Sequence, residues 1–356
     1  MHTPLCQRLG IAAPIIQAPM AGGWTTPALA VATSEAGALG MLAGARLTVD
    51  QLRAQLDETR ARTSRPYGVN FLTARPAPAR QDSTAATEAL DEIRRHLGLP
   101  AAAEERGPAF VSVEEGIEMA LRAGVRVISL AMGTPAGWAA QVHAGGAVLM
   151  AAVTTVAEAE EAASAGADIL VAQGAEAGGH RSTFTPTDPL PLIGTMALVP
   201  AVVDAVRTPV VAAGGIMDGR GVVAALALGA GAVQLGTRFL LALESGAPPT
   251  YRRRLLEASE TDPVVTDAFS GRPARGLRND YVRWFEEHGA RPLGWPRQGA
   301  AARDIYRASL AADGRWAALY AGQGVRLARR EQSAGEIVRE LMAESRSVRE
   351  RLDATA

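Results

Sequence analysis

Asp168-Ile169-Leu170-Val171-Ala172 is followed, without a spacer, by Gln173-Gly174-Ala175-Glu176-Ala177-Gly178-Gly179-His180-Arg181. The first run is short, apolar and rich in branched side chains, which is typical of a buried parallel strand. The glycines that follow allow a tight turn and a close approach to a ligand. The sequence therefore predicts a loop at the carboxyl end of a strand, and this loop presents one titratable imidazole, that of His180.

Strand-like segments of this kind recur along the chain, separated by longer helix-like stretches. The eight predicted strands are residues 14–20, 38–42, 67–72, 126–130, 147–154, 168–173, 209–213 and 232–239. Eight strands that alternate with helices are the pattern of a (β/α)₈ TIM barrel, although doubly wound sheets share the alternation. Thr26 before Pro27, and Thr48 before Val49, are typical helix starts. We predict an α/β fold, a (β/α)₈ barrel with its active site at the carboxyl ends of the strands.

The regular alternation ends after Phe239. Residues 244–298 are rich in arginine, proline and glycine, and helix-forming residues return from Trp316 onward. We therefore expect three parts: a barrel (1–240), a helical and loop insertion that forms part of the substrate side (241–315), and C-terminal helices that pack back on the barrel (316–356). Residues 73–107 are polar and alanine-rich, and they predict a long loop and a helix that decorate the barrel.

The composition favours a small-molecule partner. The chain has 356 residues, is 48% hydrophobic and carries a formal net charge of -1, so it has no electrostatic attraction for nucleic acid or a membrane. Its one cysteine, Cys6, excludes an internal disulfide, and the N-terminus lacks the layout of a signal peptide. These features predict a cytoplasmic protein. They leave the oligomeric state open, with a homodimer as one option.

Several classes of catalytic site are excluded by residue type. The sequence has no lysine, which excludes a phosphate-loop lysine, a Schiff-base lysine and a Ser-x-x-Lys nucleophile. We expect no metal site, because the histidines outside the glycine-rich loop show no ligand spacing with cysteine or carboxylates. These histidines are His2, His96, His143 and His288.

Two glycine-containing loops follow the last two predicted strands. Residues 212–216 (Ala-Ala-Gly-Gly-Ile) end one strand, and residues 233–238 (Val-Gln-Leu-Gly-Thr-Arg) end the next. In TIM barrels these two loops often bind phosphate through backbone N–H groups and a helix N-terminus, because glycine permits close approach and the helix dipole favours an anion. Tight turns in a barrel need glycine even where no phosphate binds, so one such loop alone would be weak evidence. Two such loops in successive units nevertheless favour a phosphate site.

Six segments occur in a characteristic order: Gln17-Ala18-Pro19-Met20-Ala21-Gly22-Gly23, Gly68-Val69-Asn70-Phe71, Gln173 to His180, Gly214-Gly215-Ile216, Gln234 to Phe239, and Ala321-Gly322-Gln323. As an ordered set they resemble the FMN-dependent nitronate monooxygenase family, formerly called 2-nitropropane dioxygenases. The resemblance spans nearly the whole chain. Several of the segments also resemble the flavin-dependent enoyl-acyl-carrier-protein reductases.

The family resemblance implies non-covalent FMN at the mouth of the barrel. Its phosphate is expected on Gly215, Gly236 and Thr237, in agreement with the phosphate site inferred from the loops. His180 is implied to be the base that removes the proton next to a nitro group, or the cation that holds the resulting nitronate. The other residues implied to contact the cofactor are Met20, Asn70, Gln173, Gly178, Gly179, Gln234 and Gln323.

Each of these residues also has a structural interpretation. The amides of Asn70 and Gln173 suit the donors and acceptors of a flavin edge, or else cap loop backbone. Glu176 either orients His180 or caps the loop. Tyr320 either closes over the flavin or packs in a helix. Ser182 stands where relatives often carry glycine, and a lysine near the substrate of some relatives has no counterpart, which leaves Arg326 as an arginine to consider there.

Three functions are compatible with these features of the sequence. The first is oxidation of alkyl nitronates, such as propionate 3-nitronate, or of nitroalkanes with O2 to a carbonyl compound and nitrite. The second is reduction of enoyl thioesters or quinones by NAD(P)H through the same FMN. The third is a non-catalytic protein that binds FMN or another phosphate ligand. The segment from Gln173 to Arg181 and the long tail after Phe239 favour the first.

Overall fold

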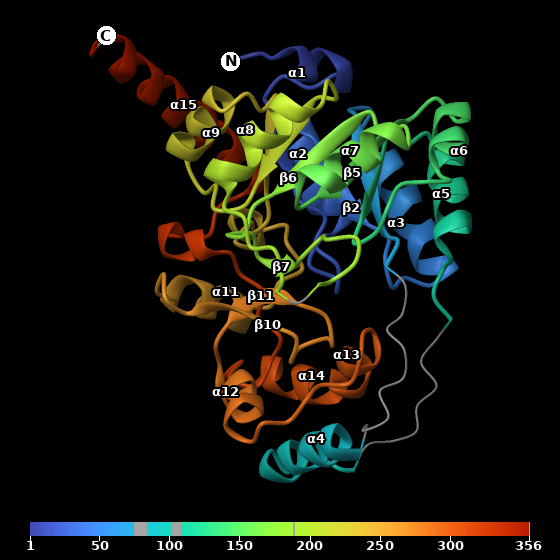
Figure 1. Ribbon diagram of the computed structural model, residues 1–356, viewed down its shortest axis with the longest axis vertical. Helices are drawn as coiled ribbons and strands as arrows, with labels where there is room; N and C mark the ends of the chain where they lie inside the picture. The colour runs from blue at the N-terminus through green and yellow to red at the C-terminus, as the bar shows by residue number, and fades with distance from the viewer. Residues whose placement is uncertain (75–83, 102–108, 188, 356) are drawn as a thin grey trace.

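The computed structural model describes residues 1–74, 84–101, 109–187 and 189–355 and contains the predicted barrel (Figure 1). Eight parallel strands form one sheet in the order β1-β9-β8-β6-β5-β4-β3-β2. A further parallel bridge joins Ile16 to Leu39, next to β2, and closes the ring. The strands are β1 (Ile15–Gln17), β2 (Gly40–Ala43), β3 (Tyr67–Leu72), β4 (Val127–Ala131), β5 (Val148–Val153), β6 (Ile169–Gln173), β8 (Val210–Ala213) and β9 (Ala232–Leu235).

Helices cover the outside of the barrel between successive strands. Their starts follow the sequence: Thr26 accepts a hydrogen bond from Leu29 N–H, and Thr48 forms a capping box with Gln51. Among the described helices, none combines the length and the apolar character that crossing a membrane requires. The covering helices are α2 (Pro27–Glu35), α3 (Val49–Arg62), α5 (Val113–Arg122), α6 (Ala139–Ala144), α7 (Val156–Ser164), α8 (Thr195–Ala205), α9 (Gly219–Ala227) and α10 (Thr237–Leu240).

The two ends of the chain both pack on the barrel. Helix α1 (Pro4–Leu9) buries Leu5, Cys6 and Leu9 against the apolar side chains inside the amino-terminal end of the barrel. Helix α15 (Ala334–Asp353) runs along α9 and α2 and joins the main hydrophobic core. Both contacts bury apolar surface, which is the main stabilising contribution to a fold of this kind.

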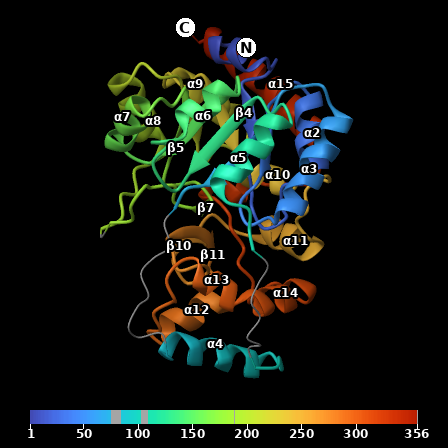
Figure 2. The ribbon, with the colours of Figure 1, turned by 90° about the vertical axis from the view of Figure 1, so that its right-hand side faces the viewer.

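The segment after the barrel contains β-structure that the sequence did not predict. Strands β10 (Pro263–Thr266) and β11 (Ala274–Leu277) pair antiparallel, and β7 (Gly179–His180) from the loop after β6 adds to β11. Figure 2 shows this small sheet between the barrel and the helices beyond it. The remaining elements are α11 (Pro249–Glu257), α12 (Asp280–Glu287), α13 (Arg297–Ala301), α14 (Arg303–Ala311) and the 3₁₀ helix η1 (Gln323–Leu327).

Helix α4 (Thr84–His96) packs on the insertion, whereas the sequence predicted a helix that decorates the barrel. Its Leu90 and Ile93 belong to a second hydrophobic core, which also contains Phe269 and Tyr281 of the insertion. Arg94 adds an ion pair to Asp304, with Nε and Oδ2 2.7 Å apart. In Figure 1 α4 lies at the far end of the molecule from α1. The long loop expected around this helix lies partly outside the described residues.

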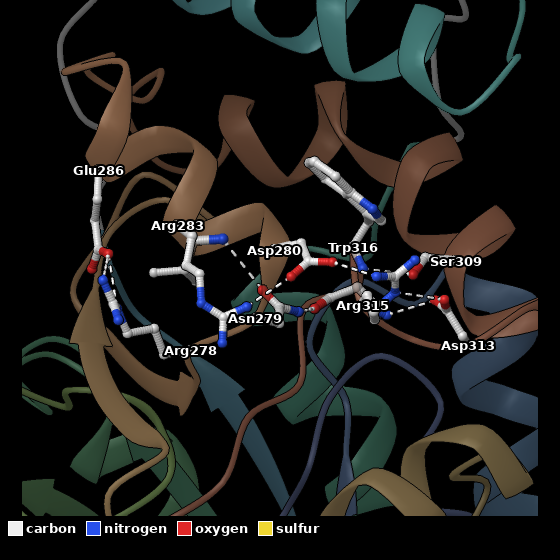
Figure 3. A network of polar contacts seen from close by, with 11 residues as sticks. Arg278, Asn279, Asp280, Arg283, Glu286, Ser309, Asp313, Arg315 and Trp316 are labelled. Atoms are coloured by element: carbon white, nitrogen blue, oxygen red, sulfur yellow. Dashed lines mark hydrogen bonds and ion pairs between the residues drawn. The ribbon is translucent and has the colours of Figure 1, made fainter.

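Polar contacts connect the helices of the insertion (Figure 3). Buried Asn279 caps α12 by accepting from Val282 N–H, and its Nδ2 donates to the carbonyl oxygen of Ala317 at 2.6 Å. Exposed Arg315 pairs with Asp313 and Asp280 at 2.7 and 3.3 Å. Surface ion pairs of this type contribute about 0–1 kcal/mol each, so the buried asparagine is the more important of these contacts for stability.

We expect Leu341→Ala in α15 to lower the free energy of unfolding by about 2–5 kcal/mol, because Leu341 is only 1% exposed and its loss leaves a cavity in the main core. Leu352→Ala in the same helix is the control, since Leu352 is 53% exposed and its removal is expected to change stability by less than ~0.5 kcal/mol. Urea unfolding followed by circular dichroism measures both. Equal losses of unfolding free energy in the two variants would contradict the packing of Leu341 in the main core.

Candidate active site

Gln173, the residue that ends β6, holds the loop that follows it. Its Nε2 donates to the carbonyl oxygen of His180 at 3.0 Å, and Ser182 N–H donates to its Oε1 at 2.9 Å. Both ends of the amide therefore fix loop backbone, which is the capping role considered from the sequence. The contacts also give Ser182 a defined place in the loop.

Glu176 caps a helix. Thr195 at the start of α8 donates its backbone N–H to both carboxylate oxygens at 2.9 Å and its hydroxyl to Oε2 at 2.8 Å. A negative charge is favourable at this end of a helix. The sequence offered two roles, orienting His180 or capping the loop; the described side-chain contacts are instead to the start of α8, and none of them is to His180.

The short strand β7 carries His180 to the edge of the insertion. In the antiparallel register His180 lies opposite Ala274, and Gly179 lies opposite Arg275. Gly179 has a φ of 79°, in the left-handed region that glycine adopts most readily. Backbone pairing therefore brings the imidazole out of the barrel loop and toward side chains that are about ninety residues away in sequence.

The imidazole contacts Ser270 and Tyr320. Its Nε2 lies 2.8 Å from Ser270 Oγ, and its ring centre is 5.4 Å from that of Tyr320. Ser270 Oγ is also placed to donate to the carbonyl oxygen of Arg272 at 3.2 Å. When the hydroxyl proton is given to that carbonyl, Nε2–H donates to Oγ, and Nδ1 of His180 keeps its lone pair. In this tautomer Nδ1 is the atom that can accept a proton.

Burial determines the protonation states in this cluster. Desolvation lowers the pKa of His180 to about 4, and the positive charges of Arg272 and Arg46 act in the same direction. The imidazole is therefore neutral at pH 7. Burial raises the pKa of Tyr320 to about 12, so its phenol stays protonated and can donate a hydrogen bond.

Three buried arginines bind loop backbone, and one of them, Arg272, also acts on His180. They are Arg181, Arg272 and Arg275, which are 1%, 6% and 6% exposed. Arg181 donates to the carbonyl oxygen of Gly174 at 2.7 Å, Arg275 donates to that of Ala175 at 2.8 Å, and Arg272 reaches those of Met132 and Thr183. None of the three forms a salt bridge with a described carboxylate. Glu158 and Glu176 act on these guanidinium groups from a distance and offset part of their charge.

The two glycine loops lie beside each other at the ends of β8 and β9, which are paired in the sheet. Gly214 and Gly215 have φ values of 114° and 71°, so the turn after β8 requires glycine. The next loop leads into α10, where the N–H groups of Thr237 and Arg238 precede the first helical hydrogen bonds. The loops therefore have free backbone donors at this edge, and phosphate binding there stays a prediction.

Residues 321–323 lie directly on the loop after β6. A Cβ atom on Gly178 would come within 2.6 Å of the backbone of Ala321 and Gly322, so only glycine permits this approach. Gln323 N–H donates to the carbonyl oxygen of Glu176 at 2.9 Å, and Gly322 N–H donates to Thr237 Oγ1 at 3.0 Å. These bonds tie the C-terminal segment to both sides of the site. The side chain of Gln323 is exposed.

The remaining predicted cofactor residues lie at other strand ends. Gln234 on β9 has a buried Oε1 without a hydrogen-bond partner among the described residues, which is an acceptor that a ligand could satisfy. Asn70 on β3 donates from Nδ2 to the backbone and hydroxyl of Ser129, both at 3.1 Å. Met20, in the loop after β1, is half-buried and packs between two hydrophobic clusters.

The sequence alone did not indicate Ser270, Arg272 or Arg46 as site residues. The first two lie in the stretch Phe269-Ser270-Gly271-Arg272, whose turn-forming residues indicated only a loop. Arg326, considered in place of a lysine, is exposed and has no described contact with His180. His143 lies at the amino-terminal side of the barrel, where its Nε2 is 2.8 Å from Asp168.

Comparison with known proteins identifies the family to which this chain belongs. The family model for nitronate monooxygenase matches residues 3–344. The chain belongs to the nitronate monooxygenase family. A probable nitronate monooxygenase of Bacillus subtilis (strain 168) is 37% identical over 348 residues, which cover 95% of this chain and 97% of the relative. One from Staphylococcus haemolyticus (strain JCSC1435) is 37% identical over 337 residues and covers 92% of each chain.

Solved structures place this nitronate monooxygenase family member among flavoenzyme barrels. A nitroalkane oxidase from Streptomyces ansochromogenes has a TM-score of 0.88 and 36% identity, covering 96% of this chain and 98% of the other. FabK from Thermotoga maritima has a TM-score of 0.79 and 29% identity, with full coverage of both chains. These findings confirm the predicted family and barrel, and family membership implies a flavin-dependent oxidoreductase.

We expect Arg46→Gln to raise the pKa of His180, because it removes a positive charge that opposes formation of the imidazolium. The pKa stays below 6.5, since desolvation, the larger cause, remains. A pH titration of histidine side-chain NMR signals measures the change. Arg53→Gln, an exposed arginine on α3, is the matched control. A His180 signal that titrates near 6.5 in the unaltered protein would contradict this description of the site.

Proposed function

We propose that this chain is an FMN-dependent enzyme that oxidises alkyl nitronates, or the parent nitroalkanes, with O2 to a carbonyl compound and nitrite. The observation that carries the proposal is the neutral imidazole of His180, held 2.8 Å from Ser270 at the carboxyl end of a barrel of this family. Similarity to a nitroalkane oxidase supports the same substrate class.

The described residues fit an FMN cofactor. The glycine loops at Gly215 and Gly236 offer backbone donors for one phosphate monoester, and the unpartnered Oε1 of Gln234 can accept from a ring N–H. The other predicted contacts, from Met20, Asn70, Gly178 and Gln323, belong to the same proposal. Bound FMN would supply the electron acceptor for the nitronate and pass the electrons to O2.

The side chains of the cluster have distinct proposed roles. Nδ1 of neutral His180 accepts the proton from the carbon next to the nitro group. Ser270 positions the ring through Nε2. The protonated hydroxyl of Tyr320 donates to a nitro oxygen, while Arg272 and Arg46 favour the negative charge that develops on the substrate.

The insertion supplies part of this cluster, which supports the proposal that residues 241–315 form the substrate side. Ser270 and Arg272 come from it, and β11 holds the strand that carries His180. The C-terminal segment adds Tyr320 and then returns to the barrel through α15. The substrate would therefore lie between the barrel mouth and the insertion.

Anaerobic reduction of the flavin tests the proposed reaction. Protein loaded with FMN is mixed, without oxygen, either with propionate 3-nitronate or with NADH. We expect the nitronate to bleach the flavin absorbance rapidly and NADH to leave it largely unchanged. Rapid bleaching by NADH alone would instead indicate the reductase function suggested by the likeness to FabK. Acid-released flavin should be unmodified FMN; protein that binds no FMN would contradict the cofactor proposal.

We expect His180→Ala to retain FMN but to lose roughly 10²–10⁴-fold in kcat/KM with a neutral nitroalkane, the range for loss of a general base. The loss should be smaller with a preformed nitronate, since that substrate has already lost its proton. His180→Asn should resemble His180→Ala, because an amide does not take up the proton at neutral pH. Steady-state oxygen consumption measures these values. Equal losses on both substrates would indicate a positioning or electrostatic role.

A further inference from the structure

Ser270, which contacts the imidazole of His180, lies in the turn between β10 and β11. The strand pairing ends before this turn, so its position depends on what packs against it. The carbonyl oxygen of Phe269, the preceding residue, accepts a hydrogen bond from the Tyr306 hydroxyl of α14 at 2.8 Å. Phe269 is only 1% exposed, and no other donor among the described residues reaches this carbonyl. Tyr306 therefore fixes the carbonyl of the peptide that leads into Ser270.

The Tyr306 hydroxyl ends a chain of buried hydrogen bonds that begins just before α13. Leu293 N–H donates to Gln298 Oε1 at 2.9 Å, and Gln298 Nε2 donates to the Tyr281 hydroxyl at 2.8 Å. A side-chain hydrogen bond joins Tyr281 to Tyr306. Gln298 and Tyr281 are both 0% exposed. The chain thus crosses α13, α12 and α14, which lie below the small sheet in Figure 2, away from the barrel.

The direction of every bond in this chain is fixed. A carbonyl oxygen only accepts, so Tyr306 gives its one proton to Phe269, and its oxygen is left to accept from Tyr281. Tyr281 in turn accepts from the amide nitrogen of Gln298, because the amide oxygen already accepts from a backbone N–H. Burial raises the pKa of both tyrosines, so both keep their protons near neutral pH. A buried network with every member satisfied has one arrangement and holds its end rigidly.

Gly271, on the other side of Ser270, rests on the same part of the insertion. Its φ is 82°, and a Cβ atom on it would lie 2.0 Å from the carbonyl oxygen of Leu293 and 2.5 Å from the nitrogen of Trp295. Trp295 N–H also donates to the carbonyl oxygen of Gly271 at 3.3 Å. Both neighbours of Ser270 are therefore held by the insertion.

We propose that Tyr306 is a positioning residue that sets the orientation and the tautomer of His180 through Ser270. The bond to the Phe269 carbonyl holds the turn, and the turn holds the Ser270 hydroxyl 2.8 Å from Nε2 of the imidazole. Nδ1 is thereby left with its lone pair. Tyr306 itself has no described contact with His180. The placement of the ring is a property of the folded chain, whereas its catalytic consequence rests on the proposed function.

The tautomer of His180 tests the proposal without reference to activity. In protein with isotope-labelled histidine and added FMN, long-range nitrogen–proton NMR spectra distinguish Nε2–H from Nδ1–H for each of the five histidines. The signal that His180→Ala removes is that of His180. We expect the Nε2–H form in the unaltered protein. Tyr306→Phe should give a mixture of both forms, because the buried Phe269 carbonyl loses its donor and the turn shifts.

Tyr67→Phe is the matched control for this measurement. Tyr67 is 5% exposed and begins β3, so the substitution removes a buried hydroxyl at the end of a barrel strand that is remote from the site. The His180 signal should be unchanged. Tyr281→Phe separates positioning from stability, since it leaves the bond from Tyr306 to Phe269 intact. It should lower the melting temperature, because Gln298 loses a buried partner, and should leave the His180 tautomer unchanged.

Kinetics tests whether Tyr306 acts through Ser270. Tyr306→Phe should lower kcat/KM with a neutral nitroalkane by about 10- to 100-fold, because a misplacement of about 1 Å can cost about 100-fold. The loss should be smaller with a preformed nitronate, which needs no base. In a Ser270→Ala background the same substitution should cause less than about a twofold further loss, since residues that act through one contact are not additive.

Four results would each overturn the proposal. They are an Nδ1–H imidazole in the unaltered protein, an unchanged tautomer in folded Tyr306→Phe, a changed tautomer in Tyr67→Phe or Tyr281→Phe, and losses of kcat/KM that add in the double variant. Failure of a nitronate to reduce the flavin would contradict the proposed function alone, because the comparison of tautomers does not depend on turnover.

Discussion

The pairing of β7 with β11 is the contact on which the geometry of the proposed active site depends. Two residues of a barrel loop join a strand of the insertion, and one of them is His180. This pairing, together with the hydrogen bond from Gln173 to the His180 carbonyl oxygen, places the imidazole beside Ser270. The opposite strand also contributes Arg275, whose Nε donates to the backbone of Ala175 in the same loop. Backbone hydrogen bonds, more than the histidine side chain itself, therefore determine where the ring lies.

The buried arginines contribute to structure and to electrostatics at once. Removing a guanidinium group from water is costly, and here the cost is offset mainly by charge-assisted bonds to carbonyl oxygens. Neutral carbonyls hold the loops, and the carboxylates of Glu158 and Glu176 offset part of the positive charge. Desolvation is the larger reason that His180 stays uncharged, and the positive charges of Arg272 and Arg46 act in the same direction. Because arginine does not lose its proton near neutral pH, these charges are the same throughout the range in which the imidazole could titrate.

Much of the barrel could be predicted from the sequence, because each strand is a local apolar run and each glycine turn follows it directly. The predicted strands ran too far at two places: β1 ends at Gln17 and β9 at Leu235, since Met20 and Phe239 are apolar but pack outside the strand ladder. The small sheet was missed because β7 has only two residues and its partner is distant in sequence. The contact of His180 with Ser270 was missed for the same reason.

Helix α4 shares one hydrophobic core with the insertion, although the chain places it between β3 and β4 and the insertion after β9. Each segment covers apolar side chains of the other: Leu90 and Ile93 of α4 pack in the same core as Phe269 and Tyr281 of the insertion. Deleting either α4 or the insertion alone would leave the other with an exposed apolar face. Helix α4 and the insertion therefore form one structural unit, although they are separated in the sequence. A variant that lacks both should expose less apolar surface than a variant that lacks only one of them.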